Sequence, residues 1–192
     1  MISRDEQRAI AVDHLADHLL RHGLAKASLR QLAAAAGVSD RMLLYYFDDK
    51  SDALTAAMER IATQLAVQLA MAIPEGTTMP AARLVAVAAE LTTQTHLRPY
   101  MRLWIEVVAA AARGEDPFVT VAQSMASGFT QWIETRLEAG DGADLQDRRA
   151  LAAAVLAVVD GLALLDVCAG EALTRSAARS IGEVLTEPDA PA

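Results

Sequence analysis

The sequence of 192 residues contains little of several residue types on which many folds depend. It has one cysteine, Cys168, which excludes an internal disulfide framework and is typical of a reducing cytoplasm. Aromatic residues make up only 4%, and there are six prolines and ten glycines. The core must therefore be built from alanine, leucine and valine, and abundant alanine and leucine favour helices over sheets. We predict an all-α protein.

Long apolar runs are also missing. Residues 1–20 lack an apolar stretch behind a basic start, so we expect no signal peptide. The most apolar segment, residues 150–165, contains Asp160 and is shorter than the roughly 18 residues that a membrane span needs. We therefore expect a cytoplasmic protein with no membrane association.

Basic residues are in the minority, and the formal net charge of -8 argues against a general attraction to nucleic acid. The deficit is unevenly distributed, because residues 1–50 hold seven basic and seven acidic residues. Because the N-terminal segment is neutral and the rest of the chain is acidic, the N-terminal segment is the part that would face a polyanion. Its affinity for the polyanion would be weak and sensitive to salt.

Residues 28–47 carry the clearest local signals. Ser28 and Gln31 have the spacing of a capping box, which starts a helix, and Gly37 is suited to end it in a left-handed conformation. Ser39 then provides the N-cap of a second short helix. Helix, tight turn and helix form the unit that places a recognition helix in a DNA major groove.

Apolar periodicity and helix-ending residues divide the rest of the chain into further helices, about nine in all. We expect a three-helix helix-turn-helix DNA-binding domain at residues 1–49. Residues 50–192 are expected to form a helical-bundle domain, with a long fourth helix as connector. The expected helices outside the helix-turn-helix span residues 3–22, 50–73, 80–96, 98–113, 117–139, 145–168 and 171–185.

Residues 4–60 resemble the DNA-binding head of the tetracycline-repressor (TetR) family of bacterial transcriptional regulators. The matching marks are RHG at the end of the first helix, SLRQLAAAAGVS through the turn, YYF at the end of the recognition helix, and Lys50. The resemblance implies a ligand-responsive transcriptional regulator that binds a palindromic double-stranded DNA operator as a homodimer. Because members of the family are commonly repressors, it also implies a repressor. It implies these DNA-binding residues: Ser28, Arg30, Ser39, Asp40, Arg41, Met42, Tyr45, Tyr46 and Lys50.

The recognition helix departs from the family pattern. Arg41 and Met42 stand where members commonly have a small residue and a threonine, and Leu44 replaces a frequent tyrosine. Arginine is suited to bidentate recognition of guanine, whereas leucine has no hydroxyl for a phosphate. We expect an operator unlike those of better-known relatives.

The segment 145–168 is apolar on nearly every side, so other helices must cover it all round. One chain of this length has few helices left to do so, and pairing with a second copy through the last two helices would supply them. TetR-like proteins dimerise in this way. The predicted interface residues are Val155, Val158, Leu162, Leu165, Leu173, Ala177, Ile181 and Val184.

Most of the scarce large aromatic side chains fall between residues 100 and 132. Core packing is one interpretation, and a cavity for a small-molecule inducer is the other. Glu106 or Asp160 beside such a cavity would favour a cationic ligand over a purely apolar one. The predicted ligand-binding residues are Leu91, His96, Tyr100, Trp104, Val107, Met125, Phe129, Trp132 and Asp160.

Other functions find less support. His14, His18 and His22 recur at four-residue spacing, but no further ligand is placed to complete a metal site. No nucleophile-and-base arrangement or phosphate-binding loop is recognisable, so we expect no metal, no cofactor and no enzymatic activity. The alternative function is a helical partner-interaction module without sequence-specific DNA binding.

Overall fold

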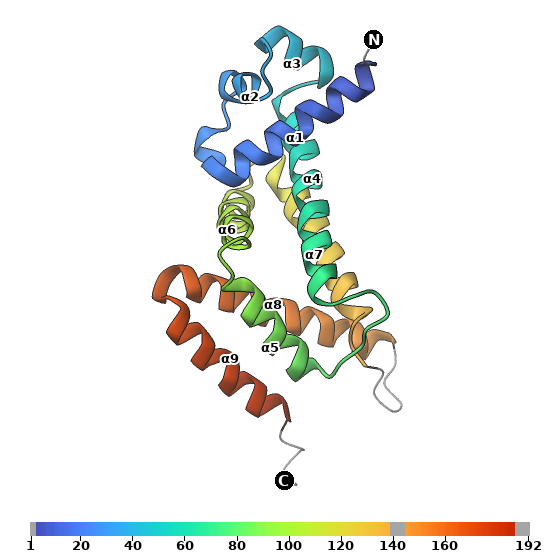
Figure 1. Cartoon of the computed structure of the whole chain (residues 1–192), viewed down its shortest axis with the longest axis vertical. Helices are drawn as coiled ribbons and strands as arrows, with labels where there is room; N and C mark the ends of the chain where they lie inside the picture. Colours follow the sequence, from blue (N-terminus) through green and yellow to red (C-terminus); the bar gives the residue numbers. More distant parts are fainter. Residues whose placement is uncertain (1–2, 139–144, 187–192) are drawn as a thin grey trace. The chain divides into compact units, whose positions relative to one another are not determined.

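A computed structural model describes residues 3–138 and 145–186 (Figure 1). Within those ranges every regular element is a helix, and the one β pairing is an isolated bridge between Met79 and Leu137. The all-α prediction is thus confirmed. The elements are α1 (Arg4–His22), η1 (Leu24–Lys26, a 3-10 helix), α2 (Leu29–Ala35), α3 (Asp40–Tyr46), α4 (Lys50–Ala72), α5 (Ala81–Thr92), α6 (Arg98–Ala112), α7 (Phe118–Glu134), α8 (Leu145–Ala169) and α9 (Glu171–Thr186).

The chain divides into two compact units. The first comprises Met1–Leu69 and Arg102–Met125, and the second comprises Ala70–Met101 and Ala126–Ala192. Most of α4 therefore packs with the N-terminal helices. This division describes packing, and the functional boundary between residues 49 and 50 stays a prediction.

In the first unit the apolar stripe of α1 forms the centre of the helix-turn-helix core. Leu15 and Leu19 are fully buried, as are Leu32 of α2 and Leu43 of α3. Helices α1 and α2 pack together, and so do α2 and α3. Arg60 of α4 donates to an Asp13 carboxylate oxygen of α1 at 2.5 Å. These contacts stabilise α2 and α3, which are too short to be stable alone.

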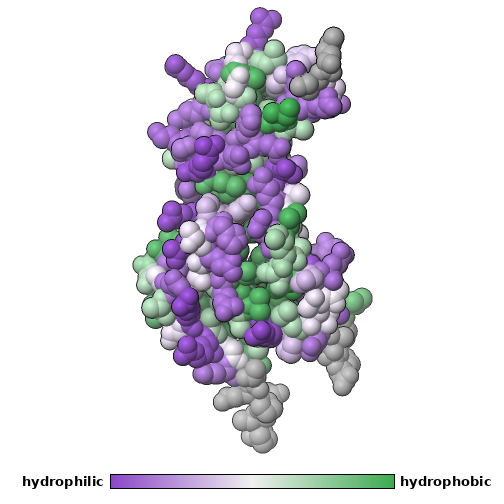
Figure 2. Space-filling model, viewed as in Figure 1, coloured by the Kyte–Doolittle hydropathy of each residue, from purple (hydrophilic) through white to green (hydrophobic). Residues whose placement is uncertain are grey.

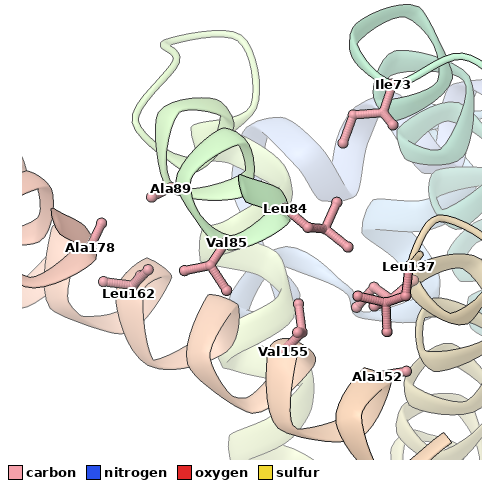
Figure 3. Packing of buried hydrophobic residues seen from close by; sticks show 10 residues of the cluster. Ile73, Leu84, Val85, Ala89, Leu137, Ala152, Val155, Leu162 and Ala178 are labelled. Atoms are coloured by element: carbon pink, nitrogen blue, oxygen red, sulfur yellow. The ribbon is translucent and has the colours of Figure 1, made fainter. Parts of the chain in front are cut away.

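In the second unit α5, α8 and α9 pack against one another in pairs. Val85 of α5 is completely buried, and Figure 3 shows its side chain beside Leu162 of α8. Ala178 of α9 joins the same cluster, so small residues allow the three helices to approach closely. Ile133 and Leu137 extend this core to the end of α7.

Two helices end earlier than their sequences predict. Helix α5 stops at Thr92 instead of residue 96, because Gln94 and Leu97 form tighter turns. Helix α7 runs over Phe118–Glu134 instead of 117–139. Beyond it the Arg136 carbonyl and the Glu138 N–H both pair with Met79. The remainder of that prediction, residue 139, lies outside the described residues.

Helix α8 is long and apolar enough to cross a membrane, by length and composition only. The expectation from the sequence considered residues 150–165 alone and therefore underestimated the length of this apolar helix. The helix is longer than that run and reaches Ala169. However, Ala152, Val155 and Leu162 are buried in the core of the second unit. A core helix of a bundle passes the same test of length and composition, so this finding does not point to a membrane.

Candidate functional site

The turn between α2 and α3 is fixed by short-range hydrogen bonds. The Ser28 backbone N–H donates to Gln31 Oε1 at 3.1 Å, and the Met42 N–H donates to Ser39 Oγ at 3.2 Å. Gly37 has φ +71°, and the Val38 N–H reaches the Ala33 carbonyl in a Schellman motif. The predicted helix, turn and helix are all present, so the turn holds α3 in a defined orientation against α2.

Helix α3 has a sharply divided surface. Leu43 is fully buried and faces the core, whereas Met42 and Leu44 are 43% and 45% exposed. Asp40 and Arg41 are exposed as well. The helix thus presents Asp40, Arg41 and Met42, three of the predicted DNA-binding residues, on its exposed face, together with Leu44. Charged and apolar groups of this kind are suited to reading base edges in a major groove.

The two adjacent tyrosines of α3 have different surroundings. Tyr45 is 58% exposed, but Tyr46 is only 8% exposed and its hydroxyl donates to Gln7 Oε1 of α1 at 3.0 Å. Tyr46 therefore joins α3 to α1 and Tyr45 is the accessible tyrosine of the pair, while a contact of either with DNA stays a prediction. The YYF sequence gives no indication of this, because the hydroxyl's partner is 39 residues away.

Two arginines of α1 hold the C-terminal end of α3, and sequence reasoning missed both. Arg4 donates to the Tyr45 carbonyl at 2.7 Å, and Arg8 donates through Nε to the Tyr46 carbonyl at 3.2 Å. Arg4 also stacks over the Tyr45 ring at 4.7 Å. Cations near unpaired carbonyls at a helix C-terminus are stabilising. The sequence does contain a signal for this pair, because Arg4 and Arg8 are four residues apart, about one helical turn, and so lie on the same face of α1.

The remaining predicted DNA contacts, Ser28, Arg30, Ser39 and Lys50, are all exposed. Lys50 is the first residue of α4, whose N-terminus is already capped because the Asp52 N–H donates to Asp49 Oδ1 at 2.8 Å. The Asp48 N–H donates in turn to Asp52 Oδ2 at 3.1 Å. Two carboxylates thus lie at this helix end beside the exposed Lys50 side chain.

Two of the three histidines of α1, His18 and His22, have contacts within the chain. His18 Nε2 lies 2.7 Å from the Lys26 carbonyl, and its ring centroid is 4.8 Å from that of His22. In the part of the chain that the structure describes, no group of three metal-binding side chains comes together.

The predicted ligand-binding residues fall in both compact units. Trp104, Val107 and Met125 belong to the first unit. Those in the second unit are Leu91, His96, Tyr100, Phe129, Trp132 and Asp160. Leu91 and Val107 are buried, His96 is exposed, and the other six are partly buried.

Two of the polar and aromatic groups expected at the cavity have partners within the chain. The Arg136 guanidinium lies over the Trp132 ring at 4.0 Å, so one face of that ring is covered. Burial lowers the pKa of Arg136, and the nearby Glu75 carboxylate opposes this shift. Glu106 accepts a hydrogen bond from the Leu24 backbone N–H at 2.6 Å. Glu106 is therefore committed to the protein backbone.

A groove lies between α5 and α9 within the second unit. It has a volume of about 580 Å³ and contains none of the predicted ligand-binding residues. Small residues such as Ala86 and Gly182 line it, together with charged side chains that include Arg83 and Arg179. Figure 2 shows hydrophilic residues intermingled with hydrophobic ones on the visible face of these helices.

The predicted dimer residues separate into two groups. Val155 and Leu162 are 3% exposed in the core of their own chain, and their part in a dimer interface stays a prediction. Val158, Ala177 and Ile181 are partly buried against the same core, and Leu165 is also partly buried. Leu173 and Val184 are exposed. Other exposed large apolar side chains of α8 and α9 are Leu145, Leu151, Leu164, Val167 and Leu185.

Several solved structures have this fold. A TetR-family transcriptional regulator from Rhodococcus sp. has a TM-score of 0.72 and 18% identity over 95% of this chain and 100% of its own. The multidrug binding protein EbrR, complexed with proflavin, has a TM-score of 0.67 and 25% identity over 94% and 99%. A transcriptional regulator from Saccharomonospora viridis, in complex with choline, has a TM-score of 0.64 and 20% identity over 93% and 96%.

Family models match both parts of the chain, although no curated protein matches it. The model of bacterial regulatory proteins of the tetR family matches residues 15–57, which confirms the resemblance seen in the sequence. The model of the C-terminal region of BetI-type transcriptional repressors matches residues 80–187, more than half of the chain. The chain therefore belongs to the TetR family of bacterial transcriptional regulators, with a C-terminal region of the BetI type.

Proposed function

We propose that the protein is a repressor that binds a palindromic operator as a homodimer and is released by a small molecule. The observation that carries the proposal is the capped, exposed face of α3 in a chain that belongs to a family of transcriptional regulators. Two recognition helices about 34 to 36 Å apart would read successive major grooves. Such a protein acts in the cytoplasm, where bacterial DNA lies.

The dimer would form through the exposed apolar side chains of α8 and α9. Leu164 and Val167 are about half exposed on α8, and Leu173 and Val184 are exposed on α9, which packs beside it. Apolar side chains gathered on two adjacent helices are expected to be covered by another surface, and a two-fold symmetric partner presents the same residues. A second copy would also cover the side of α8 that its own chain leaves open.

The inducer is proposed to be an apolar or cationic small molecule. In the second unit, Tyr100 of α6 and Phe129 of α7 supply aromatic rings, and such rings bind organic cations through their faces. EbrR was solved with proflavin and the Saccharomonospora viridis regulator with choline, a quaternary ammonium compound. These likenesses support the ligand class.

Release would follow from a shift between two dimer geometries. A ligand changes DNA affinity only as far as it prefers one geometry over the other. Helix α4 connects the helix-turn-helix to the remaining helices, and its buried Met58, Ile61 and Leu65 are suited to transmit the change.

The proposal is tested with duplexes selected from a random-sequence library by the purified protein. We expect selection of a palindrome, binding by a dimer, and weaker binding when proflavin or choline is titrated. A chain that selects no sequence even at low salt would overturn the operator-binding proposal and favour the partner-interaction module. Selective binding that no screened compound weakens would overturn only the inducer.

A further inference from the structure

A carboxylate on α6 meets the backbone where α1 ends and η1 begins. Glu106 Oε2 accepts a hydrogen bond from the Leu24 N–H at 2.6 Å. Both residues are partly buried and belong to the same compact unit. Leu24 is the first residue of η1, where backbone N–H groups have no partner inside the helix. Glu106 supplies that partner with a charged acceptor, which makes a short and strong hydrogen bond.

Gly23 makes room for this carboxylate. Its φ of +68° is one that other residues rarely adopt, and a Cβ added to it would lie 2.4 Å from Glu106 Oε1. The backbone conformation therefore requires glycine, and a Cβ at this position would also push the Glu106 carboxylate out of its present place. Gly114, in the same unit, has φ +73° but no atom within 4 Å of an added Cβ. Crowding by a carboxylate thus distinguishes Gly23 from this other left-handed glycine.

The position of this contact in the chain gives it a role. Helix η1 leads through Ala27 into Ser28, the N-cap of α2. At its other end the Lys26 carbonyl lies 2.7 Å from His18 Nε2 of α1. The segment that enters the helix-turn-helix is therefore held at its start by α6 and at its end by α1.

We infer that Glu106 is a positioning residue for DNA binding, which fixes η1 and thereby the start of α2 to α6. This inference rests on the proposed function, because it assigns the residue a part in operator binding. A movement of α6 would displace the start of α2 directly through the Glu106 carboxylate, in addition to any change transmitted through α4. The sequence conceals the contact, since 82 residues separate the two partners.

The test compares Glu106→Ala, Glu106→Gln, Gly23→Ala and the matched control Gly114→Ala in the full-length protein. The first readout is hydrogen exchange at the Leu24 amide. We expect exchange to become on the order of tenfold faster or more in Glu106→Ala, as for loss of a hydrogen bond to a charged group. Glu106→Gln keeps an oxygen acceptor and should restore most of the protection. Gly23→Ala should accelerate exchange there and Gly114→Ala should not.

The second readout is affinity for a duplex selected by the wild-type protein. We expect Glu106→Ala and Gly23→Ala to bind it about tenfold more weakly, with amide protection in α1 and α3 unchanged. Leu24 protection or operator affinity that is unchanged in Glu106→Ala would overturn the inference. A wild-type protein that selects no DNA would overturn the proposed function instead, while Leu24 exchange would still report on the contact.

Discussion

Replacing Tyr46 with phenylalanine removes the hydroxyl that donates to Gln7 Oε1 at 3.0 Å and keeps the buried ring. Gln7 is exposed, so water can replace the lost partner. We expect the free energy of unfolding to fall by about 0.5 to 1.5 kcal/mol, the net value of one hydrogen bond. Tyr46→Ala also empties the space of a large buried side chain, which costs about 3 to 5 kcal/mol.

Tyr45 is the matched control, because it is adjacent in sequence and 58% exposed. In Tyr45→Phe the ring that lies 4.7 Å from the Arg4 guanidinium is retained. The free energy of unfolding should therefore change by no more than about 0.5 kcal/mol. If the Tyr45 hydroxyl binds a phosphate as proposed, operator binding should weaken by about 0.5 to 1.5 kcal/mol.

Two assays separate these effects. Urea unfolding at one fixed protein concentration measures stability, since the proposed dimerisation would make stability depend on concentration. Fluorescence anisotropy with a selected duplex, well below the unfolding temperature, measures DNA affinity. Tyr46→Phe should change the first measurement only, and Tyr45→Phe the second only. The reasoning is refuted if Tyr46→Phe leaves stability unchanged and weakens DNA binding, because the hydroxyl would then face the phosphate.

Three further predictions concern the recognition helix, α8 and the start of α1. Arg41→Ala should cost about 1 to 3 kcal/mol of operator affinity and relax specificity at one base pair, whereas Lys50→Ala should weaken all duplexes alike. Equal losses on operator and random duplexes for both variants would contradict this. Leu164→Glu should yield a folded monomer in sedimentation, while Leu162→Ala should lower the free energy of unfolding by about 2 to 5 kcal/mol. The Ser3 N–H lowers the pKa of Glu6, so protection of the first turn should be lost as pH falls through the lowered pKa, and Glu6→Gln should remove this dependence.

Hydrogen bonds between residues close in sequence were the most predictable part of the fold. The pairing of Ser28 with Gln31, the left-handed Gly37 and the Ser39 cap each depend on a few neighbouring residues. Such contacts form wherever the local sequence allows the helix end, with little influence from the rest of the chain. This explains why the helix-turn-helix was predicted in detail.

Contacts between residues that are far apart in the sequence were not predictable. These contacts decide which side chains stay exposed and are able to bind DNA or a ligand. Tyr46 is an apparent phosphate ligand until Gln7 is known to bind its hydroxyl. Glu106 is an apparent cavity residue until Leu24 is known to donate to it. In both cases the residue type is correct for either role, and a partner on another helix determines the outcome. Single-sequence reasoning gives no distance between such partners.

Two charged residues of α8, Arg148 and Asp166, indicate which face of the helix is buried. The apolar periodicity of α8 is too weak to indicate that face. Arg148 donates to the Glu134 and Leu137 carbonyls at 3.0 and 2.6 Å, and Asp166 pairs with Arg98 at 3.4 Å. The two charged residues are 18 positions apart, about five turns, so they lie on the same face of the helix. Val155 and Leu162 occupy that face between them and are therefore the side chains turned inward. Leu164 is rotated away from this face and is half exposed, so it is where the proposed second copy would pack.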